Sequence, residues 1–248
     1  MPNPVVHFQI TGHDPAALVR FYGSVFGWRI TSLPEVDYML IDTEAGGING
    51  GIALVPPGQP GYVCLYTEVD APDAMLAQIA GSGGKVLVPV TAVPKLGVVA
   101  MYADPEGHPM GLVQAMPDYS HHEYRVYDWP PPTTEGAVVH FEITGRNLDA
   151  LRPFYRNVFG WHADTTDNPD YAPIDTHTIC ISGAFGLQER DRDPVTVFIQ
   201  TADIAGTLAR IETAGGHTVE THPPTFALFA DPEGHILGLI AEEEQPSP

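Results

Sequence analysis

The sequence predicts an α+β protein made of two similar domains in tandem, and two internal repeats carry this prediction. Residues 5–28 read VVHFQITGHDPAALVRFYGSVFGW, and residues 138–161 repeat them 133 positions later as VVHFEITGRNLDALRPFYRNVFGW. Residues 103–108 recur 127 positions later as residues 230–235. Repeats of this length indicate a duplicated domain, and two copies are too few for a solenoid. We therefore expect two domains that each bury a core, which 248 residues allow.

Each half is expected to begin with a strand and a helix. Residues 5–11 alternate between apolar and polar side chains, which predicts a strand with one apolar face. Asp14 then supplies a helix N-cap, Pro15 the first helical residue and Gly27 the stop. In the second half Pro153 lies inside the helical pattern, so that helix should kink or start late.

Further strands and a second helix complete two β-α-β-β-β modules in each half. In the first half we expect strands near residues 28–31, 38–42, 51–55, 62–69, 85–88, 98–103 and 110–114, with a helix between residues 70 and 81. Residues 104–107 are typical of a hairpin turn. The second half repeats this order with a strand at 196–201, a helix at 203–213 and a strand at 237–241. It is six residues shorter, which should shorten the loop at residues 88–97.

The composition sets the expected domain limits and excludes two classes of partner. We expect domains at residues 1–116 and 137–242, a linker rich in proline and aromatic residues at 117–136, and a frayed tail at 243–248. The net charge of −20 repels nucleic acids and anionic membranes, so neither is an expected partner. No apolar run is long enough to span a bilayer, and the first residues do not resemble a signal peptide. Together with two cysteines at unpaired spacing, Cys64 and Cys180, this predicts a soluble cytoplasmic protein, monomeric or homodimeric.

The alternation in the first strand also assigns its two faces. Helices should bury the apolar positions, which are Val6, Phe8 and Ile10 and, in the repeat, Val139, Phe141 and Ile143. The other face carries His7 and Gln9 in the first half, and His140 and Glu142 in the second. This face is either an ordinary solvated surface or, if the twisted sheet curls into a cup, the lining of a ligand cavity. Tyr62, Cys64 and Tyr66 would line the same hollow.

These motifs resemble a known family. The pattern VHFxITxxDxxALxxFYxxVFGW, followed by a turn DPEGxxxGL, is similar to the glyoxalase, bleomycin-resistance and extradiol-dioxygenase group, the vicinal oxygen chelate superfamily. The resemblance covers nearly the whole chain, once per half, and is greatest to the two-domain branch related to lactoylglutathione lyase. It implies that each half folds into two βαβββ modules forming a cup-shaped mixed sheet with helices outside.

The resemblance also implies where a metal would bind. Metal-dependent members hold the metal at four inward positions, one on the first and one on the last strand of each module. The matching residues are His7, Cys64 and Gly111 in the first half and His140, Val197 and Gly238 in the second, while the fourth position lies near Ala53 and Gln188. Glycine has no ligating side chain, so we expect no tightly held transition metal in the family arrangement. A divalent metal stays compatible only with a reduced set, His140, Glu142 and Gln188.

Two functional hypotheses follow, beside a third in which the chain is a degenerate paralogue with a regulatory or scaffolding role. The first is a glyoxalase-like enzyme, lyase-like or dioxygenase-like, that acts on a small organic substrate with His140 and Glu142 as catalytic groups. The second is a protein that binds a small molecule without chemistry, as bleomycin-resistance proteins do. In both, ligand contacts are expected from His7, Gln9, Tyr62, Cys64, Tyr66 and Gln188. Because Glu142 stands where the first half has Gln9, we expect any chemistry in the second half.

Overall fold

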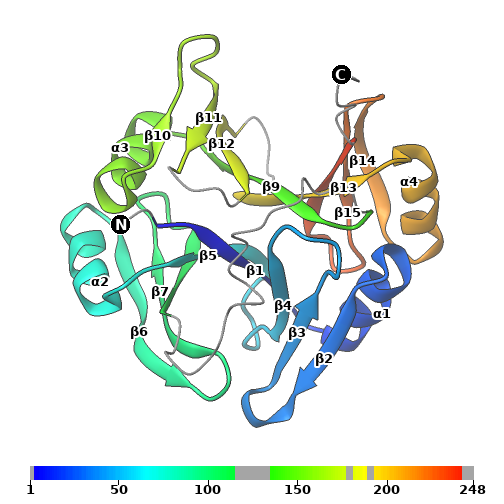
Figure 1. Cartoon of the computed structure of the whole chain (residues 1–248), viewed down its shortest axis with the longest axis horizontal. Coiled ribbons are helices and arrows are strands. Elements are labelled where there is room, and N and C mark those ends of the chain that lie inside the picture. Colours follow the sequence, from blue (N-terminus) through cyan, green and yellow to red (C-terminus); the bar gives the residue numbers. More distant parts are fainter. Residues whose placement is uncertain (1–2, 115–134, 177–180, 189–192, 242–248) are drawn as a thin grey trace.

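The computed structural model describes residues 3–114, 135–176, 181–188 and 193–241, and Figure 1 shows two sheets, one from each half of the chain. The expected linker, except for its last two residues, and the expected tail lie outside this part. Each sheet has eight strands, and the helices lie at the periphery of the molecule. The predicted tandem α+β architecture is confirmed. Within the described ranges, no helix is long and apolar enough to cross a membrane.

The first half contains β1 to β8, α1 and α2, with the sheet order β2-β3-β4-β1-β5-β8-β7-β6. Its elements are β1 (Val5–Gly12), α1 (Pro15–Phe26), β2 (Arg29–Leu33), a 3-10 turn (Pro34–Val36), β3 (Tyr38–Asp42), β4 (Asn49–Leu54), β5 (Tyr62–Glu68), α2 (Pro72–Gly81), β6 (Lys85–Val93), β7 (Gly97–Ala103) and β8 (Pro109–Gln114). At the centre, β1 runs parallel to β4 and antiparallel to β5, and β5 runs parallel to β8.

The second half repeats this topology in the order β10-β11-β12-β9-β13-β16-β15-β14. Its elements are β9 (Val138–Gly145), α3 (Leu148–Phe159), β10 (His162–Ala163), β11 (Tyr171–Asp175), β12 (Ser182–Leu187), β13 (Val195–Thr201), α4 (Ile204–Thr213), β14 (His217–His222), β15 (Phe226–Ala230) and β16 (Ile236–Ala241).

The predicted ends of the first helix are confirmed. The Asp14 side chain accepts a hydrogen bond from the Ala17 amide, and Gly27 ends α1 with a left-handed φ of 73°. Of the two effects expected from Pro153, a kink or a late start, the late start is wrong, because α3 begins at Leu148 with Pro153 inside it. Proline removes one backbone hydrogen bond, but the buried face of α3 retains the helix, since tertiary packing supplies most of a helix's stability.

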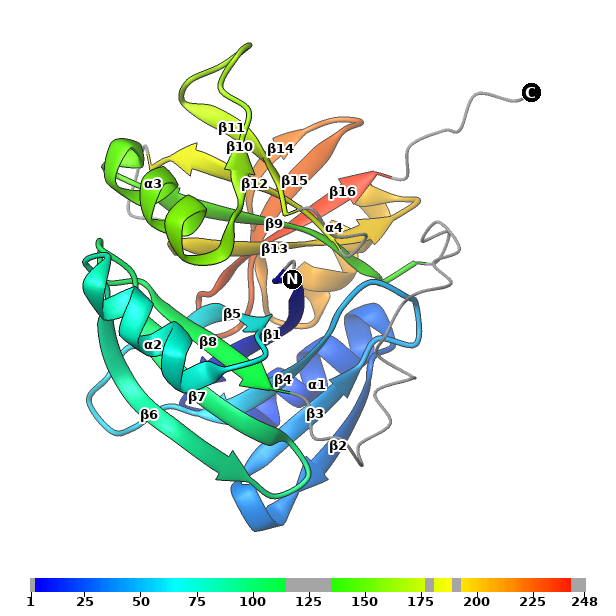
Figure 2. The ribbon, with the colours of Figure 1, turned by 60° about the vertical axis from the view of Figure 1, so that its left-hand side comes forward.

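Two further expectations are corrected by strand pairing. A bulge between Val5 and His7 turns Val5 into the core, while Val6 is only partly buried; Val138 likewise replaces Val139. An extra residue in one strand reverses which side chains face inward. Residues 88–97 are not a simple loop, because β6 continues to Val93 and pairs there with Gly97 at the start of β7. Figure 2 shows this long, curved hairpin.

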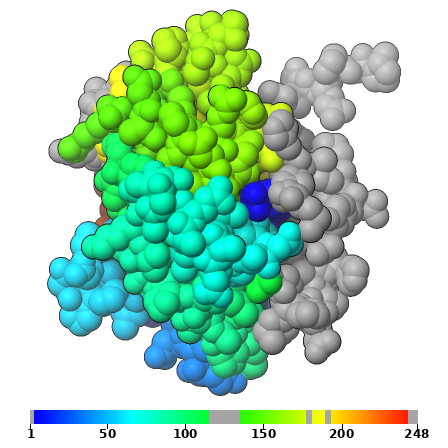
Figure 3. Space-filling view, turned by 90° about the vertical axis from the view of Figure 1, so that its left-hand side faces the viewer, coloured from blue at the N-terminus to red at the C-terminus, as the bar shows by residue number. Residues whose placement is uncertain are grey.

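The two halves share a seam across which their helices pair. In Figure 1, α1 lies beside α4 and α2 beside α3, and both pairs are in contact. The ring centroids of Phe21 and Phe229 lie 6.3 Å apart, and those of Tyr102 and Phe154 lie 6.2 Å apart. The cores expected for separate halves therefore join into one cluster. Figure 3 shows side chains of α2 and α3 meeting along this seam.

The hairpin turns of the second repeat connect the halves reciprocally. Glu233, in the second half, accepts hydrogen bonds from the backbone amides of His13 and Asp14 ahead of α1. Glu106 in the first half binds the amides of Arg146 and Asn147 ahead of α3 in the same way. Carboxylates at helix N-termini satisfy amides that have no partner in the helix and oppose the helix dipole. The repeated turn is thus part of the interface.

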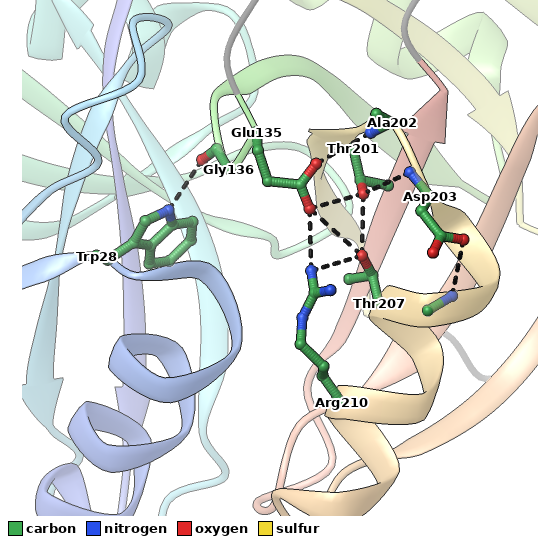
Figure 4. A network of polar contacts seen from close by, with 9 residues as sticks. Trp28, Glu135, Gly136, Thr201, Ala202, Asp203, Thr207 and Arg210 are labelled. Carbon is green, nitrogen blue, oxygen red and sulfur yellow. Dashed lines mark hydrogen bonds and ion pairs between the residues drawn. The ribbon is translucent and has the colours of Figure 1, made fainter.

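Glu135 and Gly136, just before β9, form hydrogen bonds with both halves of the chain (Figure 4). The Trp28 indole Nε1 of the first half donates to the Gly136 carbonyl, 2.9 Å away. The Glu135 carboxylate accepts from the Thr201 hydroxyl, the Ala202 amide and the Arg210 guanidinium. These contacts fix the strand that carries His140 and Glu142.

Candidate functional site

Each sheet places one residue from each of its four central strands in a straight row. In the first half, strand register aligns His7 with Asn49 and Tyr66, and Tyr66 with Gly111. In the second half it aligns His140 with Ser182 and Phe198, and Phe198 with Gly238. Residues level with one another on neighbouring strands face the same side of a sheet. Each row therefore crosses the middle of one cup.

In the first cup, the predicted ligand-binding residues are brought together but bind one another. His7 Nε2 lies 2.8 Å from the Tyr38 hydroxyl, and the Tyr66 hydroxyl donates to Gln9 Oε1 over 3.0 Å. Tyr38 and Tyr66 are each 8% exposed, and burial raises the pKa of both hydroxyls. Two aromatic side chains of this cup are thus buried and bonded to its histidine and its glutamine.

Cys64 and Tyr62 lie beside this group on β5. Cys64 is fully buried, and burial raises the pKa of its thiol, so it is no nucleophile at neutral pH. Burial, together with Cys64, raises the pKa of Tyr62 to about 12. Cys180 lies outside the described residues.

In the second cup, His140 joins a chain of polar side chains. Its Nδ1 lies 2.7 Å from the Ser182 hydroxyl, and its Nε2 lies 3.4 Å from the Tyr171 hydroxyl. Burial lowers the pKa of His140 to about 4, so the imidazole is neutral at pH 7. Burial, followed by the charge and hydrogen bond of Glu142, raises the pKa of Tyr171. The two predicted catalytic residues are therefore linked through Tyr171.

Tyr171 and Ser182 were not predicted as site residues, although the repeat contains a signal for one of them. Tyr171 stands 133 positions after Tyr38, the same offset that relates His140 to His7. Both halves thus pair a histidine with a tyrosine. The second pair is more accessible, because Tyr171 is 40% exposed whereas Tyr38 is 8% exposed.

Strand register corrects one match between the halves. Gln9 aligns with Cys64, and Glu142 aligns with Thr196, so Thr196 and not Val197 is the counterpart of Cys64. Val197 is fully buried in the core. The repeat has lost one residue before this strand, which the 133-residue offset did not reveal.

The fourth metal-ligand position of the family, expected near Ala53 and Gln188, also matches other residues. Asn49 and Ser182 lie level with the two histidines, not Ala53 or Gln188. Gln188 follows the end of β12, six residues beyond Ser182, which is roughly 20 Å along a strand. The structure therefore does not bring Gln188 to His140.

The residues of the two rows do not fit the metal that the family resemblance implies. Each row contains one histidine, one short polar residue, one aromatic ring and one glycine. A tetrahedral or octahedral site needs three or more ligating side chains. In the described part of the chain, no three His, Cys, Asp or Glu side chains are grouped closely enough to hold a metal ion.

Comparison with known proteins agrees with this fold. A family model described as "Glyoxalase-like domain" matches residues 7–113 and 140–240. "Putative glyoxylase CFP32" of Mycobacterium bovis is 25% identical, with 94% of this chain and 92% of that protein covered. "Anthracycline biosynthesis protein DauV" of Streptomyces sp. is 23% identical, with 98% and 94% covered.

Solved structures are similar in fold. The 2,3-dioxygenase LapB from Pseudomonas sp. KL28 has a TM-score of 0.69 at 12% identity, with 100% of this chain and 96% of that chain covered. The Mn(II)-bound glyoxalase from Novosphingobium aromaticivorans has a TM-score of 0.68 at 15% identity, with 98% and 84% covered. At these identities the likeness extends to the fold alone.

Proposed function

Because the chain belongs to the glyoxalase-like domain family, we propose that its second cup binds a small organic molecule and performs acid–base chemistry on it. The proposal rests on one observation, the chain of contacts from Ser182 through His140 and Tyr171 to Glu142. Relatives named as a glyoxylase and as anthracycline biosynthesis proteins support a role in small-molecule chemistry. The proposal includes a cytoplasmic location and a monomer or homodimer.

The hydrogen bonds of this chain of contacts indicate which side chain carries each proton. The Tyr171 hydroxyl has one proton, which goes to the Glu142 carboxylate because a charge-assisted hydrogen bond is the stronger one. The Tyr171 oxygen then accepts from His140 Nε2–H, and His140 Nδ1 accepts from the Ser182 hydroxyl. In this arrangement Glu142 is the base, and Tyr171 can return a proton to the reacting molecule.

At the position of Glu142, the first cup has no equivalent base. Gln9 occupies the place of Glu142, and an amide only forms hydrogen bonds. The oxygen of that amide already accepts a hydrogen bond from Tyr66. We assign the first cup a structural role or, at most, a role in positioning the ligand.

The alternative is a binding protein without turnover, in which the same residues hold the ligand. The observation that favours it is the incomplete metal row of both cups. The two functions differ in their response to Glu142→Gln, which changes turnover in an enzyme and only affinity in a binding protein.

A matched pair of variants tests where the ligand binds. With a ligand found by thermal-shift screening of small organic compounds, Tyr171→Phe should weaken affinity by about tenfold, because one hydrogen bond to a charged network is lost. Tyr38→Phe removes the corresponding hydroxyl from the first cup and should change affinity by less than about threefold. Titration calorimetry gives both values. A larger loss in Tyr38→Phe would reject the second cup as the ligand site.

A further inference from the structure

We propose that an aromatic ring in each cup occupies the space that a bound metal and its carboxylate ligand would need. The rings are Tyr66 in the first cup and Phe198 in the second, and each lies over a glycine on the neighbouring central strand. Both cups are thereby closed to a metal on their central row, whatever reaction the second cup performs.

The two glycines provide the steric part of the argument. A Cβ atom added at Gly238 would lie 2.1 Å from Phe198 Cδ1, and one added at Gly111 would lie 2.3 Å from Tyr66 Cδ1. Real Cβ atoms essentially never approach a neighbour within 3.0 Å. Neither glycine has a positive φ, so the backbone does not require glycine there. The missing side chain makes room for the ring.

The rings also lie against the histidines that would be the remaining ligands. The Phe198 and His140 centroids are 5.4 Å apart at an interplanar angle of 68°, and those of Tyr66 and His7 are 5.7 Å apart at 82°. Edge-to-face packing of this kind is favourable. Phe198 is only 4% exposed, so it is a packed part of the cup.

Both nitrogens of His140 are already engaged. Nδ1 contacts the Ser182 hydroxyl and Nε2 contacts the Tyr171 hydroxyl. To bind His140, a metal would have to replace one of these hydrogen bonds and also displace the Phe198 ring. A metal on this row would therefore require changes to both the ring and the glycine, beyond the gain of a single carboxylate.

This pairing predicts that metal binding is restored only by changing both residues. In protein purified without a histidine tag, Phe198→His combined with Gly238→Glu should bind about one equivalent of Co²⁺. Equilibrium dialysis and the visible ligand-field absorption measure it, and adding His140→Ala should abolish it. Wild type and Gly238→Glu alone should bind less than about 0.1 equivalent at this site. Stoichiometric Co²⁺ in wild type that is lost on His140→Ala, or a folded double variant without Co²⁺ binding, would overturn the proposal.

A thermal-stability cycle tests the same pairing with smaller changes. Gly238→Ala should lower Tm by roughly 4–8 °C, because the new methyl group overlaps the Phe198 ring. In a Phe198→Ala background the same change should shift Tm by less than roughly 2 °C. Gly111→Ala with and without Tyr66→Ala is the matched pair in the first cup. Equal losses in both backgrounds would show that the ring does not exclude the side chain.

Discussion

Replacing Glu142 with glutamine should lower turnover by about 10²-fold or more, since a correctly placed general base contributes about that much. Glutamine preserves the shape and the hydrogen bond to Tyr171 but cannot accept a proton from the substrate. The effect should appear mainly in kcat, because ligand binding needs only the shape and the hydrogen bonds. Steady-state kinetics on the substrate identified by screening give the two constants.

The matched control for this prediction is Gln9→Ala in the first cup. Gln9 accepts a hydrogen bond from Tyr66 and occupies the place that Glu142 has in the second half. Its loss should leave kcat within about threefold of the wild type, as expected for a residue that only helps positioning. Full activity in Glu142→Gln with lost activity in Gln9→Ala would move the reaction to the first cup.

The second large effect is expected at the seam, where Asp231→Ala should reduce the free energy of unfolding by about 3–5 kcal/mol. Asp231 is 2% exposed and accepts hydrogen bonds from the His235 and Glu233 amides, the Tyr22 hydroxyl and His235 Nδ1. Its removal leaves several buried donors without a partner. Urea titration measures the loss, and Glu35→Ala, at an exposed ion pair with Lys95, should leave the midpoint nearly unchanged. A loss at Asp231 no larger than that control would contradict this description of the seam.

The buried pair of Asp231 and His235 should also make the free energy of unfolding depend on pH. Burial by itself lowers the pKa of His235, but its hydrogen bond to Asp231 and the charges of Asp231, Asp193 and Glu233 outweigh burial, so the pKa is raised from 6.5. A raised histidine pKa adds stability that is complete below the unfolded value and is lost as pH rises through the folded value. The advantage of wild type over His235→Ala should therefore be largest below pH 6.5 and shrink above it.

The sequence alone was sufficient for the architecture because the fold depends on features that repeat. Helix α1 was predicted to the residue, since Asp14 and Gly27 are strong local signals. The bulge beside Val6 was not predictable, because an extra residue in a strand depends on its pairing with β5. The late start considered for α3 does not occur, since the packed face of this helix outweighs the local preference of Pro153.

The geometry of the candidate site follows from the sequence in part, for the same reason. His140 and Glu142 follow from a two-residue period on one strand, and the structure places them on one face of β9. Tyr171 comes from a different strand, so its contact with both depends on the register of β9, β12 and β11. The glycine at position 238 was visible, but the Phe198 ring above it was not, because the alignment of β13 was off by one residue.

The most direct test of whether the second cup is the functional site is the response of the two cup histidines, His7 and His140, to a bound ligand. NMR spectra of protein with labelled histidine rings report each cup separately. The variants His7→Gln and His140→Gln assign the two resonances. Without ligand, His140 should titrate near pH 4. On addition of the small organic ligand found by screening, the His140 resonances should shift clearly, and those of His7 should shift less or not at all. Shifts at His7 with His140 unchanged would contradict the assignment of the second cup as the functional site.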